Sequence, residues 1–458
     1  MHVLTALSLS LVVAALLWNS IYNTVIYLTA ARSGKAGRGE LGASRRSLVV
    51  VVPSRGEPIR ILAETAARIA RACRFIESRC EGLLVLDDDP DYVAKLLEEL
   101  SRLRALDRVD IVLRVNGVGG RNGAMNDGVR LSSTELVMVV DADSRVSSSL
   151  IDEASRCPDV CVAPWRTYGL YGTRAEEAMR FATDLGTWVF YVLKSRTKLF
   201  VYPLGAGTII DRRVLEDIGL WRTDVVQDDM WLGTELARRG LVPRVLNSHL
   251  GVSAPPTLDA AAIQLTRWSY GAVDVVVRFW RNIASSPLPP ASKIEAYAYL
   301  LQPLQSVIGF AGLLLGIPAM LLERCSTIFV PEAIIPYAVF IAVSAVYAAI
   351  VRRFVESFGE ELYRAKAPFL MGRSSAISAT ILPLLASSAL CGLVGKRLRY
   401  RITPKEVGSR RASPIAICSS IAWGSLFAAS LALSNMPVAL MYLAFLAGSL
   451  YSLIRLRS

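Results

Sequence analysis

The sequence predicts an α/β domain placed between an N-terminal membrane helix and a C-terminal, α-helical membrane region. Hydrophobic residues make up 53% of the 458 residues and the mean hydropathy is +0.41, yet 20% of the residues are charged. That combination is typical of a soluble domain joined to membrane spans. Between residues 47 and 255, short apolar runs alternate with amphipathic segments, which indicates a mostly parallel sheet covered by helices.

The first element is an almost uncharged segment, Val3 to Thr29, which is long enough to cross about 30 Å of hydrocarbon. It lacks a basic start and a small-residue cleavage site, so we predict a membrane anchor over residues 1–30 rather than a removed signal peptide. Basic residues follow it. The positive-inside rule places them, and therefore the α/β domain, in the cytoplasm.

The composition limits the partners and the chemistry. The net charge of +12 fits attraction to anionic membrane lipids, because the basic residues cluster beside apolar segments. No interleaving of basic and aromatic residues indicates a nucleic-acid partner. We interpret the seven scattered cysteines, Cys157 and Cys161 among them, as buried small hydrophobic residues rather than zinc ligands or a disulfide framework. With only two histidines, acid–base chemistry must rest mainly on carboxylates.

The predicted α/β domain spans residues 47–255. Its strand candidates are Leu48 to Val52, Gly82 to Leu86, Ile111 to Val115, Val137 to Val140 and Val160 to Val162. Helical spacing covers Arg60 to Arg74 and Tyr92 to Leu106. Three of the strands end in polar residues, and the carboxyl ends of parallel strands line one crevice. These ends hold Pro53, Arg55 and Glu57, then Asp87 and Asp88, and then Asp141 and Asp143.

Asp141 and Asp143 stand one residue apart directly after a buried strand. Two hard oxygen ligands at that place suit Mg²⁺ or Mn²⁺ bridging a diphosphate. The plain alternative is a polar turn with solvated aspartates. Between the second and third strand ends, a glycine-rich turn, Gly119 to Asn126, leads into a helix, where backbone N–H groups and Arg121 would hold phosphate.

Two further segments carry candidate chemistry. The small-residue turn around Gly205 would let a ligand approach the backbone closely, and Asp228 and Asp229 open a helix that runs to about Arg239. Acidic residues at a helix start are often only caps. The competing interpretation makes Asp229 a general base that takes a proton from an acceptor hydroxyl as it attacks.

The segment 256–292 is predicted to hold interfacial helices, with Thr257 as an N-cap. Gln264, Arg267 and Trp268 share one face of such a helix. A guanidinium suits a diphosphate leaving group, and an indole offers a flat platform for a sugar ring. The alternative is a helix at the membrane surface that Trp and Arg simply anchor.

The chain resembles the membrane-integrated family 2 glycosyltransferases, the group that contains cellulose and hyaluronan synthases, in the order of its motifs: P-S-R-G-E-P, D-D-D, R-N-G-A-M-N, D-A-D, L-G-A-G-T, Q-D-D and Q-L-T-R-W. The likeness covers Ser47 to Trp268. It implies a Rossmann-like GT-A fold that uses a nucleotide-diphosphate sugar, with a UDP sugar preferred. The order of the motifs carries the resemblance, because any one of them alone is common.

The resemblance also implies roles for individual residues. Asp87 or Asp88 would contact the base of the donor, while Asp141 and Asp143 would bind nucleotide and metal. Asp229 would be the general base, beside Asp228. Gln264 and Arg267 would hold the diphosphate, and Trp268 would lie under the acceptor sugar. Late in the chain, the run Y-R-I-T-P-K resembles the gating loop of polysaccharide synthases, with its key positions at Tyr400, Thr403 and Lys405.

The chain departs from the family pattern at three points. The usual T-E-D reads Gln227-Asp228-Asp229, which keeps a carboxylate at the position of the base. The lysine of the family's K-x-G-x-x-N stretch is Arg121. One N-terminal span replaces the two of cellulose synthase, which puts a polymer-conducting channel in doubt.

The C-terminal membrane region, residues 293–458, contains four clear spans: Tyr297 to Leu322, Ile328 to Ile350, Ile415 to Leu433 and Pro437 to Leu453. The apolar segment 368–395 is also long enough to span. Because basic residues and the gating-like loop 396–412 follow it, both of its ends should be cytoplasmic, so we predict an interfacial or re-entrant helix. With the anchor, the count is five spans.

The sequence therefore predicts an integral membrane enzyme, an inverting glycosyltransferase that extends a β-linked glycan as polysaccharide synthases do. The alternative is transfer of a single sugar to a membrane lipid, either a glycolipid or a polyprenyl phosphate, which the small membrane region favours. A non-enzymatic transporter or receptor would explain the spans. It would not explain three acidic strand ends followed by an R-W face in this order.

Overall fold

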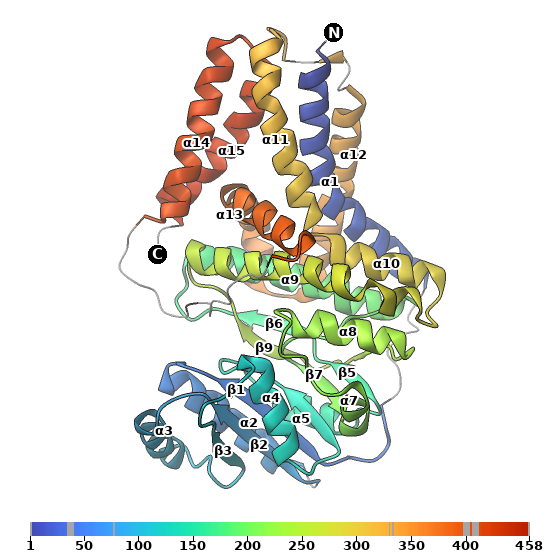
Figure 1. Ribbon diagram of the computed structural model, residues 1–458, viewed down its shortest axis with the longest axis vertical. Helices are drawn as coiled ribbons and strands as arrows, with labels where there is room; N and C mark the ends of the chain where they lie inside the picture. Colours follow the sequence, from blue (N-terminus) through green and yellow to red (C-terminus); the bar gives the residue numbers. More distant parts are fainter. Residues whose placement is uncertain are drawn as a thin grey trace.

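The computed structural model describes residues 2–33, 41–76, 78–328, 330–331, 334–396, 404 and 412–456. The chain forms two parts stacked along the long axis of the molecule, with the α/β domain below a bundle of long helices (Figure 1). The N-terminus lies at the far end of the bundle, so the first helix runs down to the α/β domain. The tyrosine, threonine and lysine of the predicted gating loop, Tyr400, Thr403 and Lys405, lie outside the described residues.

A seven-stranded sheet forms the centre of the α/β domain. Its strands are β1 (Leu48–Ser54), β2 (Cys80–Leu86), β3 (Val109–Leu113), β4 (Leu136–Val139), β5 (Val160–Val162), β7 (Thr208–Asp211) and β8 (Arg244–Val245). They lie in the order β3-β2-β1-β4-β7-β5-β8. In this sheet β7 runs antiparallel to its neighbours β4 and β5, while the other described pairs are parallel. The predicted mostly parallel sheet is confirmed, as are the five predicted strands, although β3 ends at Leu113, two residues before the predicted end at Val115.

A second, two-stranded sheet pairs β6 (Trp165–Tyr168) with β9 (Leu250–Ser253) in parallel. The sequence did not predict β6, β7, β8 or β9, because each has only two to four residues and, unlike β4 and β5, contains no three consecutive apolar residues. Runs that short give little periodicity to recognise. They matter for the site, because β6 and β9 lie between the seven-stranded sheet and α9 (Figure 1).

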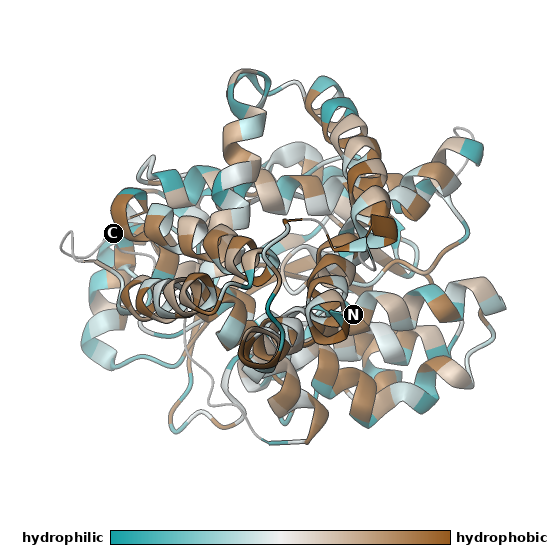
Figure 2. Cartoon of the chain, turned by 90° about the horizontal axis from the view of Figure 1, so that it is seen from above, coloured by the Kyte–Doolittle hydropathy of each residue, from teal (hydrophilic) through white to brown (hydrophobic). Residues whose placement is uncertain are grey.

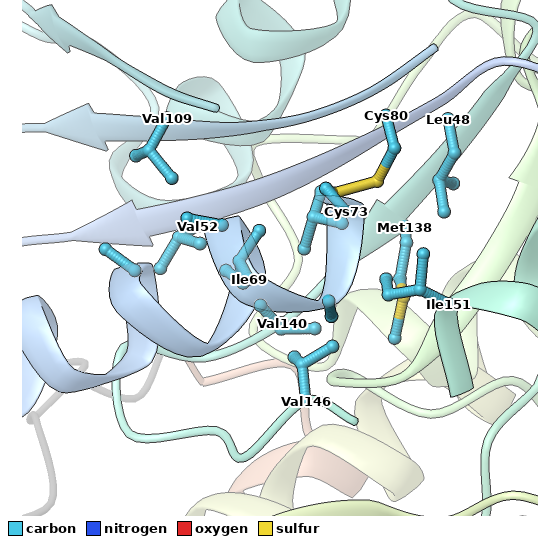
Figure 3. Close-up of a cluster of buried hydrophobic side chains, with 14 of the residues drawn as sticks. Leu48, Val52, Ile69, Cys73, Cys80, Val109, Met138, Val140, Val146 and Ile151 are labelled. Carbon is cyan, nitrogen blue, oxygen red and sulfur yellow. A yellow bond between two sulfur atoms is a disulfide. The ribbon is translucent and has the colours of Figure 1, made fainter. Parts of the chain in front are cut away.

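The sheet is covered on both faces, which is why the interior strand β1 is apolar from Leu48 to Val52. In β1, Leu48, Val50 and Val52 belong to one core cluster, while Val49 and Val51 belong to the other. This alternation follows from the two-residue period of a strand. Figure 3 shows the first cluster, in which side chains of α2 pack onto β1 and β4. Each fully buried Val, Leu or Ile side chain there contributes roughly 1.5–3 kcal/mol.

The helices of the α/β domain are α2 (Ile59–Arg74), α3 (Pro90–Arg102), α4 (Gly120–Leu131), α5 (Ser148–Ser155), α6 (Arg174–Thr187), α7 (Arg212–Ile218) and α8 (Asp228–Arg238). A π-helical turn, η1 (Trp188–Leu193), and a 3₁₀ turn, η2 (Lys194–Arg196), continue α6. The predicted helix from Tyr92 to Leu106 ends earlier, at Arg102. Its backbone reverses at Arg104, where φ is 52°, a left-handed value that no helix continues through.

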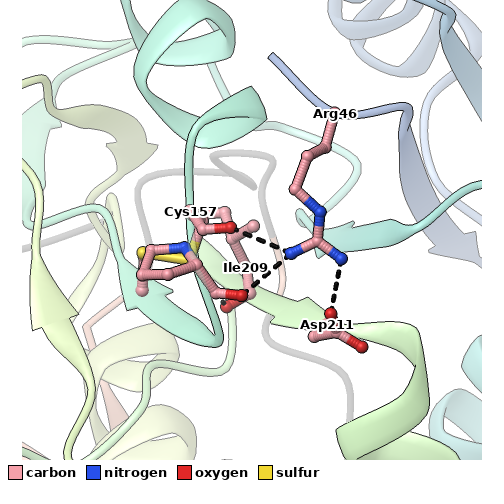
Figure 4. The surroundings of a disulfide bond; sticks show 6 residues. Arg46, Cys157, Ile209 and Asp211 are labelled. Atoms are coloured by element: carbon pink, nitrogen blue, oxygen red, sulfur yellow. Dashed lines mark hydrogen bonds and ion pairs between the residues drawn. A yellow bond between two sulfur atoms is a disulfide. The ribbon is translucent and has the colours of Figure 1, made fainter. Parts of the chain in front are cut away.

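The interpretation of all cysteines as unpaired hydrophobic residues is wrong for four of them. Cys73 pairs with Cys80, which joins the end of α2 to the start of β2 inside the core (Figure 3). Cys157 pairs with Cys161 across the turn into β5 (Figure 4). Beside that turn, Arg46 donates to the carbonyls of Cys157 and Pro158 and to Asp211, at 3.3, 2.8 and 2.5 Å. Folding brings each pair together, which their sequence spacing alone did not reveal.

Above the α/β domain lie α9 (Leu258–Ala284) and α10 (Pro290–Leu301), followed by long helices. Six described helices are long and apolar enough to cross a membrane: α1 (Val3–Arg32), α11 (Leu304–Leu322), α12 (Ile334–Phe358), α13 (Glu361–Leu393), α14 (Pro414–Ala432) and α15 (Met436–Arg455). Seen from above, hydrophobic residues run along the helices of the bundle (Figure 2). The span predicted from Tyr297 starts later, because Pro303 separates α10 from α11.

One of these six helices, α13, lies between the α/β domain and the vertical helices (Figure 1). Toward the domain, Ser374 donates to the Ala178 carbonyl of α6, and the Leu385 carbonyl accepts from Ser269 of α9, both at 3.0 Å. On its other side, Thr380 bonds Ser452 of α15 at 2.9 Å. The predicted interfacial position of this helix relative to a bilayer stays a prediction.

Candidate active site

One cavity of about 1030 Å³ lies between the carboxyl ends of β1, β2 and β4 and the helix α9. It brings together most of the predicted site residues: Pro53, Arg55, Glu57, Asp87, Arg121, Asp141, Asp143, Gly205, Asp228, Asp229, Gln264, Arg267 and Trp268. Asp88 is not among the residues that line it. Its carboxylate accepts the N–H of Gly56 at 2.7 Å, so Asp88 shapes the turn after β1 instead.

The sheet end of the cavity is organised by Arg114, a residue that the sequence analysis did not single out. Its side chain is only 5% exposed, and Nη1 lies 2.9 Å from both carboxylate oxygens of Asp87. The same guanidinium bonds Asp127 at 2.8 Å and the carbonyl of Val118 at 2.5 Å. Arg114 therefore fixes both the acidic strand end and the glycine-rich turn. The available signal was its position, since it directly follows β3 as the other polar residues follow their strands.

The glycine-rich turn leads into α4 as predicted. Gly119 and Gly120 have φ values of 82° and 56°, which only glycine adopts readily. A side chain on Gly119 would also meet Thr223 at 2.6 Å. Gly119, Gly120 and Arg121 line the cavity, so α4 begins at its wall, and the N–H groups of a helix start together with the helix dipole favour an anionic ligand.

Arg121 is the first charged residue of α4 and links three parts of the site. It lies 3.0 Å from Asp141, 2.7 Å from Asp228 and 2.6 Å from the carbonyl of Gly205. The predicted phosphate ligand is therefore engaged with carboxylates in this structure. Guanidinium groups hold carboxylates and phosphates through the same planar geometry.

Asp141 and Asp143 follow β4 and both line the cavity. The side chain of Asp141 is 48% exposed, whereas Asp143 is buried and accepts a hydrogen bond from the hydroxyl of Ser253 in β9. The described residues hold no cluster of three His, Cys, Asp or Glu side chains fit for a metal. Two carboxylates nevertheless fit Mg²⁺ or Mn²⁺, since such ions are commonly held by one or two carboxylates together with substrate phosphates and water.

Asp229 lies in the first turn of α8, with an exposed fraction of 6%. Its two carboxylate oxygens accept the N–H groups of Gly205 and Met230, each at 2.9 Å. Burial, with a further contribution from the charge of Asp228, raises the pKa of Asp229 to about 7. A carboxylate with that pKa accepts a proton effectively near neutral pH.

The side of the cavity nearest the long apolar helices is formed by α9 and β6. Thr257 caps α9 as predicted, since its hydroxyl accepts the N–H of Ala260 at 3.1 Å. Gln264, Arg267 and Trp268 all line the cavity from this helix. Sequence reasoning missed Trp165, which lines the same wall; its ring centroid lies 6.2 Å from that of Trp268.

Comparison with known proteins places this architecture in one enzyme family. Family models described as glycosyl transferase family 2 and glycosyl transferase family group 2 match residues 49–219 and 136–351. A probable glycosyltransferase of Sulfolobus acidocaldarius is 24% identical over 399 residues, covering 84% of this chain and 83% of that protein.

Two further relatives match about half of this chain and about half of their own length. The beta-monoglucosyldiacylglycerol synthase of Synechocystis sp. is 25% identical over 49% of this chain and 47% of that protein. The poly-beta-1,6-N-acetyl-D-glucosamine synthase of Staphylococcus epidermidis is 23% identical over 50% of this chain and 54% of that protein.

Among solved structures, a mannosyltransferase from Pyrobaculum calidifontis, in complex with GDP-mannose and Mn²⁺, superimposes with a TM-score of 0.58 at 17% identity. The match covers 86% of this chain and all of that one. This likeness confirms the predicted fold, a GT-A-like mixed α/β sheet flanked by N-terminal and C-terminal apolar helices. The two family models of this group together run over residues 49–351, and on that ground the chain belongs to glycosyltransferase family 2.

Proposed function

We propose that this chain is a membrane-bound inverting glycosyltransferase that moves a sugar from a nucleotide-diphosphate sugar to a hydroxyl group at the end of a β-linked glycan. The observation that carries the proposal is the placement of Asp229, a buried carboxylate of raised pKa, in one cavity with Asp141, Asp143 and Trp268. As the acceptor oxygen attacks the anomeric carbon, its proton passes to Asp229. The bond from that carbon to the diphosphate breaks in the same displacement, which inverts the configuration.

The donor fits the sheet end of the cavity. Its base would lie near Asp87 and the residues after β1, and its diphosphate would lie at the start of α4, within reach of Arg121 and Arg267. Asp141 and Asp143 would hold Mg²⁺ or Mn²⁺, which neutralises diphosphate charge when bound. On this view, stabilisation of the leaving group is the larger catalytic effect, and the base adds roughly 10² to 10⁴ in rate.

Arg121 gives this proposal an internal constraint. It is engaged with Asp141 and Asp228 now, so a diphosphate must compete for its guanidinium or join the same cluster. Either arrangement leaves Asp228 beside the donor and Asp229 beside the acceptor. We therefore assign Asp228 to holding Arg121, and proton transfer to Asp229.

A second acceptor class has specific support. The Synechocystis relative is named for a glycolipid product, and the wall formed by α9 faces the membrane helices (Figure 1). A lipid-borne hydroxyl could reach Trp268 from that side. We further propose that the α/β domain is cytoplasmic and that α13 lies in the membrane interface, because its contacts with α6 and α9 extend along the top of the domain.

The proposed function is tested with purified protein in lipid nanodiscs that contain diacylglycerol and glycolipid. UDP-glucose, UDP-N-acetylglucosamine and GDP-mannose, each radiolabelled, are supplied with Mn²⁺ or Mg²⁺, and products are sized. A polymer sensitive to a β-glycosidase supports the glycan synthase, and one discrete glycolipid supports the alternative. If none of a broad nucleotide-sugar panel is consumed, while the protein remains monodisperse, the proposal is refuted.

A further inference from the structure

Trp165 occupies a position that no predicted motif explains. It is the first residue of β6, half-buried, and it lines the cavity together with Thr167 two residues on. Because successive strand residues point to opposite sides, the intervening Arg166 is turned away and exposed, with its guanidinium over the ring of Phe358. One face of this short strand is therefore dedicated to the cavity.

The indole of Trp165 is held rigidly. Its N–H donates to the carbonyl of Ala206 at 2.7 Å, so its one polar group is already satisfied. The neighbouring residue Gly205 donates its own N–H to Asp229 at 2.9 Å. Adjacent residues of one backbone turn therefore hydrogen-bond the indole and the proposed base. A ligand that packs on Trp165 would lie at a fixed position relative to Asp229.

Trp268 approaches the same wall from α9. The two indole centroids lie 6.2 Å apart and the ring planes are inclined by 33°, so the rings form adjoining panels rather than a closed stack. Both side chains are half-buried and both line the cavity. Aromatic faces beside a few fixed polar groups are typical of sites that bind flat, partly apolar ligands.

We propose that Trp165 and Trp268 form a two-panel platform for two consecutive sugar rings of the acceptor. Trp165 supplies a saccharide subsite beyond the one that Trp268 provides. A pyranose ring presents C–H groups on its faces and hydroxyls around its rim. It can therefore cover an indole face while its hydroxyls reach groups such as Asp229 and Thr167. The separation of the panels is comparable to the length of one pyranose unit with its glycosidic oxygen.

This inference rests on the proposed function, because it concerns the acceptor of that reaction, and it makes the acceptor class more specific. The acceptor would be a glycan, or a glycolipid with at least two sugars in its head group. A lipid hydroxyl or a single sugar would leave the Trp165 panel uncovered. The platform therefore predicts a preference that can be measured as binding, without knowledge of the donor.

The test uses the full-length protein in lipid nanodiscs, so that no sugar-headed detergent competes. The probes are methyl β-glucoside and methyl β-cellobioside, with the corresponding N-acetylglucosamine pair, and their dissociation constants are measured by ligand-observed NMR. We expect wild-type protein to bind one of the disaccharide glycosides about tenfold more tightly than the matching monosaccharide. Trp165→Leu should remove that difference, whereas Trp165→Phe should retain part of it.

Trp280→Phe is the matched control, because Trp280 also lies on α9, is 49% exposed and does not line the cavity. It should bind all probes as the wild type does. Nucleotide affinity, measured in parallel, should be unchanged in every variant and reports that the site is folded. If Trp165→Leu is not folded by this criterion, Trp165→Phe and the wild type still decide the question.

Equal binding of one and two sugars by wild-type protein would overturn the platform, as would full retention of the disaccharide preference in a folded Trp165→Leu. The proposed function would fail separately, by the absence of transfer from any nucleotide sugar.

Discussion

The substitution Asp229→Asn isolates the proposed base with the least change in shape. In the wild type, both carboxylate oxygens accept a backbone N–H, from Gly205 and from Met230. The asparagine side chain has one oxygen and one NH₂ group, so one of these two backbone donors loses its acceptor. Transfer should fall by roughly 10² to 10⁴ because the acceptor hydroxyl has no partner for its proton. Nucleotide affinity should change little, since Asp229 is assigned to the acceptor.

The same variant should change stability in a pH-dependent way. Raising the pKa of Asp229 from 3.8 to about 7 corresponds to a cost on the order of 4 kcal/mol when the carboxylate is charged. The sign follows from linkage: the cost is absent below about pH 4, where the group is protonated in both states, and complete above about pH 7. Asparagine removes this cost but leaves one N–H unmatched, at roughly 1–3 kcal/mol. The variant should therefore denature at a higher temperature than the wild type at pH 8.5, and this difference should largely vanish by pH 5, where the remaining cost in the wild type is about as large as that of the unmatched N–H.

The assay measures transfer from pH 5.5 to 8.5 with saturating donor and acceptor, together with thermal denaturation. Wild-type kcat should rise with a midpoint near pH 7 as Asp229 loses its proton. Asp228→Asn is the matched control: it breaks the 2.7 Å ion pair with Arg121 but leaves the base in place, so it should lower activity and keep a rising limb. Near-wild-type transfer by Asp229→Asn, or a flat wild-type profile when proton transfer is rate-limiting, would refute the reasoning.

Three further perturbations test two buried ion pairs and the proposed metal. Arg114→Met leaves the carboxylate of Asp87 without its buried partner, which should destabilise the protein by about 3–5 kcal/mol and weaken nucleotide binding. Thermal denaturation measures the first effect and equilibrium dialysis the second. An unchanged midpoint of thermal denaturation would contradict the role of Arg114. Lys194→Met breaks a buried 2.5 Å ion pair with Glu295 and should destabilise the protein by a similar amount. The double variant Lys194→Met/Glu295→Leu should recover most of that stability. Equal denaturation midpoints for the single and double variants would show that the unpaired charge of Glu295 does not cause the loss. Removal of divalent ions with EDTA should abolish transfer until Mn²⁺ is restored. The variant Asp143→Ala should need a higher Mn²⁺ concentration for its half-maximal rate. Full activity in EDTA would exclude the proposed metal.

The regular elements of the fold could be predicted because their sequences contain the necessary pattern. β1 is apolar from Leu48 to Val52 and α2 repeats its apolar face every three to four residues, so burial in each case follows from composition and period. The short strands that lack such an apolar run could not be predicted in this way. β6, β8 and β9 are held in place by their partners and by tertiary hydrogen bonds, such as the one from the N–H of Thr167 to Asp184 at 2.8 Å.

The residues of the candidate site likewise fall into those that could be predicted from the sequence and those that could not. Residues at strand ends and helix starts, such as Asp141, Asp143 and Asp229, could be predicted because topology alone brings those positions to one edge of the sheet. Arg114 and Trp165 could not. Their importance depends on which carboxylate or carbonyl lies within hydrogen-bonding distance after folding, and pairs such as Trp165 with Ala206 are far apart along the chain.

The sequence by itself determined the class of the protein: an α/β domain with apolar helices at both ends, the motif order of a family 2 glycosyltransferase, and many of the residues that line one cavity. These properties depend on local periodicity and on the order of motifs, both of which the linear chain contains. Only the tertiary structure decided which cysteines pair, that Asp88 shapes a turn, that Arg121 bridges two carboxylates, and that a second indole stands beside Trp268. Each of these depends on distances between distant segments, and packing of the whole domain sets those distances.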